Sequence, residues 1–84
     1  MNFTRTISTN NGAFEFNFRK LPGDDYYNFQ ADVSDQNGKL IQFSIYRDPH
    51  DRWHASGNPL PLWISDEETS IGQSIEEEIS SKTI

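Results

Sequence analysis

Apolar and polar residues alternate over the first two thirds of the chain, which is the period-two pattern of strands that bury one face. The clearest stretch is Phe14, Phe16 and Phe18, separated by Glu15 and Asn17. Turn-forming residues, among them Asn-Gly and Pro-Gly pairs, divide the pattern into short runs. The runs predict antiparallel strands at about 2–8, 13–19, 26–34, 39–47 and, as a shorter fifth strand, 52–56.

The pairing within the first hairpin can be predicted because cross-strand neighbours share one face of a sheet. Asn11-Gly12 is the sequence typical of a two-residue type I′ turn. A loop of these two residues places Ile7 opposite Phe16, so apolar side chains meet. We therefore expect a tight turn at 11–12.

The same reasoning gives a different loop between the third and fourth strands. A two-residue Asn-Gly loop there would place Asp32 opposite Phe43 and mix the two faces. A three-residue loop, with Gly38 in the left-handed conformation of a G1 bulge, instead pairs Val33 with Ile41. We expect the three-residue loop.

The segment 48–51 carries proline where a type I turn accepts it, so the chain should reverse there. A short returning strand would point Trp53 inward and His54 outward. Continuing the register places Ser44 between Gln30 and His54 on the polar face.

A helix should follow the two prolines that end the sheet. Ser65 and Glu68 match a capping box, with Ser65 as the cap and Glu68 reaching back to it. Acidic residues in the first turn also suit the helix dipole. These signals predict a helix over about 66–81.

One face of this helix is apolar, because Ile71, Ile75 and Ile79 repeat every four residues. We expect that stripe to face the sheet. Gly72 lies beside it and costs about 1 kcal/mol relative to alanine in a helix interior. We interpret Gly72 as a point where the helix backbone closely approaches the sheet.

These elements predict an α+β protein, a four- to five-stranded antiparallel β-meander with one C-terminal α-helix packed on one face. Residues 1–84 should form a single domain, since no change in composition separates two cores. A chain of this length buries only about 60% of the surface that it exposes when unfolded, so its core is only slightly larger than independent folding requires.

The net charge of −6 arises mainly near the C-terminus, where residues 59–84 carry six Asp or Glu against one Lys. The chain has no cluster of Lys and Arg of the kind that binds phosphate backbones or anionic membranes. We therefore expect neither nucleic acid nor membrane as a partner. The charge favours a basic protein partner.

The absence of cysteine excludes disulfides and thiolate metal sites. Residues 1–8 lack the apolar run of a signal peptide, and no stretch is long enough to span a membrane. These features predict a cytoplasmic protein. Arg5 and Arg52 would protect the edges of the sheet, so we expect a monomer.

Ser44, His54 and Asp32 would share the polar face, which raises the question of catalysis. Nucleophilic catalysis needs a base within hydrogen-bond reach and oxyanion donors in a water-poor site. A flat, exposed face lacks such donors. We assign no catalytic residue to this chain.

His50 and His54 lie four residues apart with aspartates nearby, a spacing that brings two imidazoles together only on a helix. Pro49 argues against a helix at that point. The glutamates at 76–78 point in different directions around a helix and cannot converge on one ion. No glycine-rich phosphate loop occurs either. We expect no metal site and no cofactor.

Aromatic and arginine side chains outside the core are the candidates for binding a partner, because Tyr, Trp and Arg are enriched at interface hot spots. Tyr26 and Tyr46 are expected on the open sheet face, near Arg47 and Arg52, although cross-strand packing also explains them. Trp63 either closes one end of the core or forms an exposed contact. The candidate binding residues are Tyr26, Tyr46, Arg52, His54 and Trp63.

Two functions fit these features. The first is a non-enzymatic protein-interaction module that uses an acidic helix surface and a polar, tyrosine-bearing sheet face. The alternative is a small ligand-binding protein or enzyme that uses the outer face around Ser44, Tyr46 and His54, which requires a concave pocket. No motif in the sequence identifies a function directly.

Overall fold

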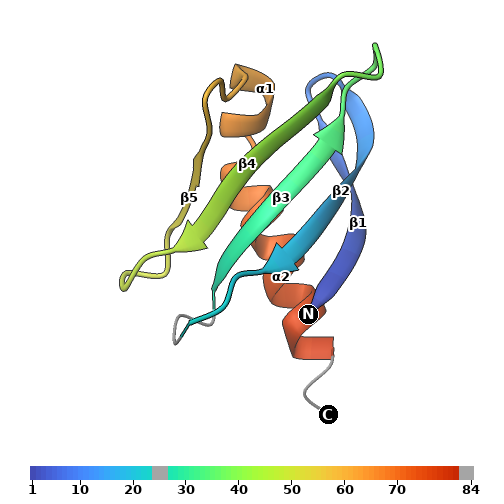
Figure 1. The fold of residues 1–84 in the computed structure, drawn as a ribbon. Coiled ribbons are helices and arrows are strands. Elements are labelled where there is room, and N and C mark those ends of the chain that lie inside the picture. Colours follow the sequence, from blue (N-terminus) through green and yellow to red (C-terminus); the bar gives the residue numbers. More distant parts are fainter. Residues whose placement is uncertain (24–26, 82–84) are drawn as a thin grey trace.

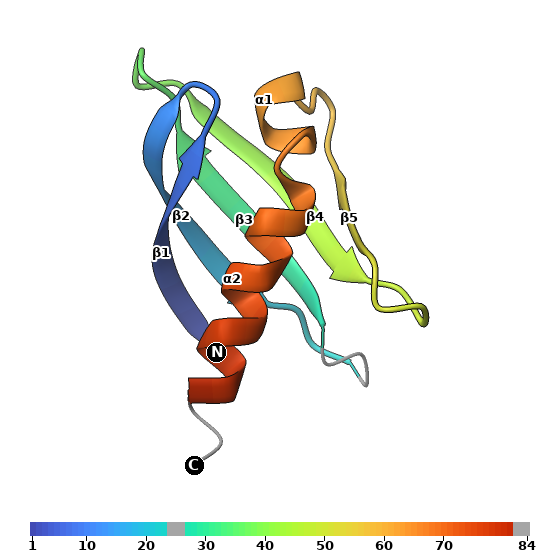
Figure 2. The same ribbon diagram turned by 180° about the vertical axis from the view of Figure 1, so that it is seen from behind.

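The computed structural model describes residues 1–23 and 27–81, which form one five-stranded antiparallel sheet with helix on one side (Figure 1 and Figure 2). The strands follow one another across the sheet in sequence order. The predicted α+β meander with a C-terminal helix on one face is confirmed. The elements are β1 (Asn2–Thr9), β2 (Gly12–Lys20), β3 (Asn28–Ser34), β4 (Leu40–Arg47), β5 (Trp53–Ser56), α1 (Leu62–Ser65) and α2 (Glu68–Ser81).

The core lies between the inner face of the sheet and α2, which crosses that face (Figure 2). The predicted stripe of three isoleucines on α2 is buried, as is Gly72. On the sheet side, aromatic and branched side chains supply most of the buried area, each contributing roughly 1.5–3 kcal/mol. Among the apolar core residues of the described part, those with no exposed surface are Phe16, Phe29, Ala31, Val33, Ile45, Ile64, Ile71 and Ile75.

The first hairpin is shifted by two residues from the predicted register. Ile7 lies opposite Phe14 rather than Phe16, and residues 10–11 form the loop. A type I′ turn needs a positive φ at both loop residues, but here the positive φ, 122°, belongs to Gly12. The Thr9 hydroxyl closes the loop by accepting from the amide of residue 11 and donating to the Gly12 carbonyl. A shift of two keeps every side chain on its face, so the alternation could not detect it.

The hairpin formed by β3 and β4 has the predicted three-residue loop and the predicted pairing of Val33 with Ile41. Gly38 has a φ of 80° and donates its amide to the Asp35 carbonyl at 2.9 Å. The Asp35 carboxylate accepts from the amides two and four residues later, at 2.8 and 2.9 Å. One aspartate therefore satisfies two loop donors that would otherwise need water.

The loop between β4 and β5 repeats this arrangement with a different residue at the strained position. The Asp48 carboxylate accepts from the amides two and four residues later, at 2.8 and 3.0 Å. Asp51, with a φ of 63°, occupies the position that Gly38 occupies in the loop between β3 and β4. Aspartate tolerates this left-handed conformation better than most residues.

The left-handed Asp51 changes the pairing of β4 with β5. Tyr46 lies opposite His54, and Ser44 lies opposite Ser56. The predicted pairing of Ser44 with His54 is therefore wrong, because β5 is shifted by two residues along β4 from the predicted register. The predicted neighbourhood of Ser44 and Gln30 is confirmed.

The capping box is also wrong, and α2 begins at Glu68 rather than Asp66. Ser65 belongs to the short helix α1, and its hydroxyl donates to the Leu62 carbonyl. Because Ser65 lies inside a helical turn, it cannot take the extended backbone of an N-cap. Glu68 instead accepts the backbone amide of Ala55 in β5 at 2.9 Å.

Candidate functional site

The outer face of the sheet carries polar side chains and lies opposite α2 (Figure 1 and Figure 2). Strand pairing arranges these side chains in rows that run across the sheet. A partner can cover a face of this composition only if it forms hydrogen bonds to the polar side chains and packs against the aromatic rings. Three of these rows are Asn2, Arg19, Gln30, Ser44 and Ser56; Thr4, Asn17, Asp32 and Gln42; and Asn28, Tyr46 and His54.

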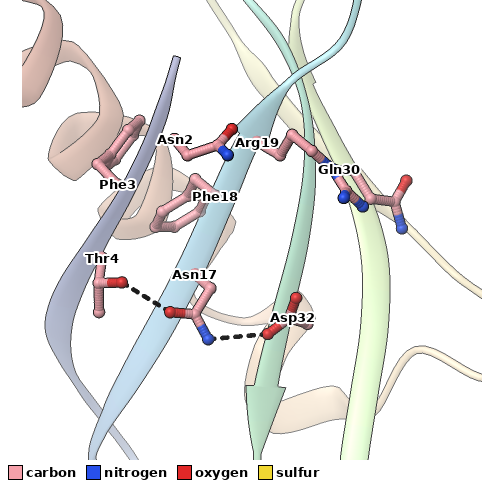
Figure 3. A pocket seen from close by; sticks show the side chains of 8 residues that line it. All are labelled: Asn2, Phe3, Thr4, Asn17, Phe18, Arg19, Gln30 and Asp32. Atoms are coloured by element: carbon pink, nitrogen blue, oxygen red, sulfur yellow. Dashed lines mark hydrogen bonds between the residues drawn. The ribbon is translucent and has the colours of Figure 1, made fainter.

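A hydrogen-bonded chain links three strands within the second row (Figure 3). The Thr4 hydroxyl donates to Asn17 Oδ1 at 2.7 Å, and Asn17 Nδ2 donates to Asp32 Oδ1 at 2.9 Å. These two bonds fix the orientation of the Asn17 amide and leave its second N–H available. In the neighbouring row, Ser44 donates to Gln30 at 3.2 Å.

A shallow hollow of about 290 Å³ opens beside these hydrogen-bonded side chains (Figure 3). Arg19 extends along its rim towards Gln30, so a guanidinium and the Asp32 carboxylate lie on one surface. Charged and amide groups of both donor and acceptor type therefore face solvent together. The lining residues are Asn2, Phe3, Thr4, Asn17, Phe18, Arg19, Gln30 and Asp32.

Tyr46 and His54 form an aromatic pair on the same face. Tyr46 is 41% exposed, and its ring centroid lies 5.3 Å from that of His54. His54 Nε2 lies 2.7 Å from Asp48 Oδ2, and because a carboxylate can only accept, this nitrogen carries the proton. The loop carboxylate thus holds the imidazole, which in turn supports the tyrosine ring.

Asp48 is the group whose titration this network changes. The hydrogen bond from His54, followed by the backbone amide of Arg52, lowers the pKa of Asp48 from 3.8 to about 2. The amide of His50 and the charge of His54 act in the same direction, while desolvation opposes them. Asp48 therefore stays ionised at every physiological pH and remains an acceptor.

The predicted binding residues fall in different places. Tyr46, His54 and Arg52 lie at the β4–β5 end of the sheet, with Arg52 exposed. Trp63 is partly buried and packs on Phe14, with ring centroids 5.1 Å apart, so it closes one end of the core. Tyr26 lies outside the described residues.

Arg47 was expected near the outer tyrosines, but it lies on the helix side of the sheet. Its guanidinium sits 3.5 Å from the centroid of the Tyr27 ring. It also donates to Glu76 at 2.7 Å and lies 3.7 Å from Asp51. The strand period explains the difference, because residues 46 and 47 must point to opposite faces.

Several carboxylates of α2 have partners within the protein. Glu76 accepts from Arg47 and, at 3.1 Å, from the Trp53 indole nitrogen. Glu77 forms an ion pair with Arg5 at 2.9 Å. The acidic helix surface is thus less available to a partner than the charge count alone suggests.

Sequence reasoning missed two residues that organise this face, Asp48 and Asn17. The similarity of the two loops was a usable signal for Asp48, since Asp35 and Asp48 both precede a three-residue turn. Asn17 had no such signal, because its role depends on the strand register.

Within residues 1–23 and 27–81, no three His, Asp or Glu side chains lie close enough to hold a metal ion together. Neither helix in that part of the chain has the length and apolar composition needed to cross a membrane. The chemistry available on the outer face is hydrogen bonding, aromatic contact and charge.

Comparison with known proteins adds no assignment to this geometry: the chain matches no protein-family model, no curated protein sequence and no solved structure.

Proposed function

We propose that this protein is a small non-enzymatic interaction module whose outer sheet face, centred on Tyr46, binds a basic protein partner. The observation that carries the proposal is the exposed Tyr46 ring, held in place by His54 and Asp48 on a face that neither of the described helices covers. Tyrosine is enriched at binding hot spots, and an ordered ring loses little entropy on binding.

The basic character of the partner follows from charge. The net charge is −6, and the long-range field of such a chain speeds encounter with a positively charged protein. An exposed tyrosine can also take a lysine or arginine over its ring. We place this interaction in the cytoplasm and expect the free protein to be a monomer.

The alternative, a ligand or catalytic site around Ser44, Tyr46 and His54, has less support. Ser44 is bonded to Gln30 and paired with Ser56, and His54 is bonded to Asp48. The serine and the imidazole therefore have separate partners rather than one another.

A capture experiment with matched variants tests the proposal. Immobilised wild-type protein, Tyr46→Ser and Leu40→Ser would be exposed to lysate at about 50 and about 500 mM salt. Leu40 is a good control because it is an exposed apolar residue, 55% accessible, on the same strand and face but at the opposite end of β4. We expect a protein with a basic surface to be retained at low salt by the wild type and Leu40→Ser, and to be lost with Tyr46→Ser.

Retention of the same partner by Tyr46→Ser would refute the role of the sheet face. If no basic protein is retained by any of the three proteins, the proposed function itself is wrong.

A further inference from the structure

β1 is an edge strand, and its backbone groups alternate between paired and unpaired positions. Lys20 donates its amide to the Met1 carbonyl at 2.9 Å, which in the observed register means that odd-numbered residues of β1 bond to β2. The even-numbered residues direct their N–H and C=O groups away from the sheet. These residues are Asn2, Thr4, Thr6 and Ser8, and all four are exposed.

The opposite edge of the sheet is closed. β5 is only four residues long, and the amide of Ala55, which points away from β4, is taken by the Glu68 carboxylate at 2.9 Å. Pro59 and Pro61 follow shortly and cannot donate to a further strand. β1, in contrast, is eight residues long and offers about 26 Å of edge.

We propose that the β1 edge binds an extended, basic segment of the partner protein as a sixth strand of the sheet. This inference rests on the proposed function, because the segment belongs to the same basic partner. The β1 edge lies three strands from Tyr46, a distance of about 14 Å, so one partner can reach both surfaces. Backbone hydrogen bonds would supply affinity, and alternate side chains would supply specificity.

The basic character of the segment follows from the side chains that flank the edge. Arg5 points towards α2 and donates to one oxygen of Glu77. The Glu77 side chain is 72% exposed, and its other oxygen can accept from a second cation. A lysine or arginine on the inner side of the added strand would lie beside this carboxylate. On the outer side, the added residues would meet Thr4 and Thr6, which favour β-branched neighbours.

A second copy of this chain fits the edge less well. Two chains with a net charge of −6 each repel one another at low salt. The antiparallel register that pairs Asn2 with Ser8 and Thr4 with Thr6, whose backbone groups point outward, also places Arg5 opposite Arg5, and like charges directly opposite are destabilising. An added strand from a basic protein has neither disadvantage.

Thr6 offers a sharp test, because its amide points outward and takes no part in the β1–β2 ladder. Thr6→Pro removes that donor and places the proline ring in the path of an added strand, while an edge strand tolerates the proline. Thr6→Val keeps the amide and is the matched control. The probe is a library of random nonapeptides displayed on phage, selected on the wild-type protein at about 50 mM salt.

We expect the selected peptides to alternate β-branched with basic residues. Their affinity should fall at least about tenfold for Thr6→Pro, which is the loss of one or two hydrogen bonds, and stay within about twofold for Thr6→Val. Glu77→Gln should lower the affinity for these peptides at low salt and have little effect on it at high salt. In the wild type, peptide binding should slow hydrogen exchange of the Thr4 and Thr6 amides, a readout that does not depend on how well Thr6→Pro folds.

Selected peptides that bind Thr6→Pro as tightly as wild type and leave these amides unprotected would overturn the inference, as would a selection that enriches no peptide. Light scattering that shows a wild-type dimer lost in Thr6→Pro would assign the edge to a second copy and also overturn it. The proposed function is judged separately, because it depends on the loss of the captured partner with Tyr46→Ser.

Discussion

Gly72 of α2 lies directly against the indole ring of Trp53 in β5, so closely that a Cβ at position 72 would overlap the ring atoms. This contact explains why a helix interior carries glycine, and it confirms the predicted close approach of the helix backbone to the sheet. Trp53 is 6% exposed, and Glu76 one turn along α2 accepts its indole N–H. The helix and the edge strand are therefore joined at this point by packing and by a hydrogen bond.

Gly72→Ala should lower the free energy of unfolding by about 1–3 kcal/mol. Overpacking against a buried, anchored ring outweighs the gain of about 1 kcal/mol in helix propensity. Urea unfolding followed by tryptophan fluorescence measures the change, with Gln73→Ala as the control because Gln73 is exposed on the same helix. A Gly72→Ala protein as stable as the wild type would show that Trp53 does not pack as described.

Glu76→Ala should destabilise the protein more than Glu77→Ala. Glu76 bonds both Arg47, whose side chain is 20% exposed, and the Trp53 indole, so its removal leaves partly buried donors unpaired. We expect a loss of about 1–2 kcal/mol for Glu76→Ala and less than about 0.5 kcal/mol for Glu77→Ala, whose ion pair is largely exposed. Equal losses in thermal unfolding would contradict this ranking.

The two aspartate loops permit an internal comparison at the left-handed position. Gly38→Ala should cost about 1–2 kcal/mol, because alanine is strained at a φ of 80°. Gly38→Asp should recover part of that loss, since Asp51 adopts a φ of 63° in the equivalent loop. Chemical denaturation of the three proteins tests the order, and a Gly38→Asp protein less stable than Gly38→Ala would mean that the loops are not equivalent.

The stability of the protein should depend on pH through Asp48. The folded-state pKa of about 2 lies below the ordinary value of 3.8, so the carboxylate stabilises the fold above pH 3.8 and this contribution disappears as the pH falls towards 2. Asp48→Asn should therefore show a smaller decrease in stability between these two pH values than the wild type. Asp35→Asn serves as the comparison at the other loop, and unfolding curves that are parallel for wild type and Asp48→Asn across this range would contradict the assignment.

The sequence was sufficient for the strand order, the faces and the helix stripe, because alternation and a four-residue repeat define which side chains must be buried. It was not sufficient for register where two registers keep the same faces. The hydrogen bonds of the Thr9 hydroxyl stabilise the observed register of the first hairpin, and the left-handed Asp51 belongs to the loop that pairs Tyr46 with His54. Glu68 was misassigned for a related reason, because its partner, the Ala55 amide, is distant in sequence. The binding face could be predicted as a surface, but not the Asp48–His54–Tyr46 arrangement that orders it.

A shift map of the ¹⁵N-labelled protein in unlabelled lysate tests the central claim most directly, since it reports which residues a partner touches without any substitution. We expect the amide signals of Tyr46, His54 and Ser44 to shift or broaden at low salt and to recover at high salt. Changes confined to the exposed side of α2, or a spectrum unchanged by the lysate, would contradict the claim that the outer sheet face binds a basic partner.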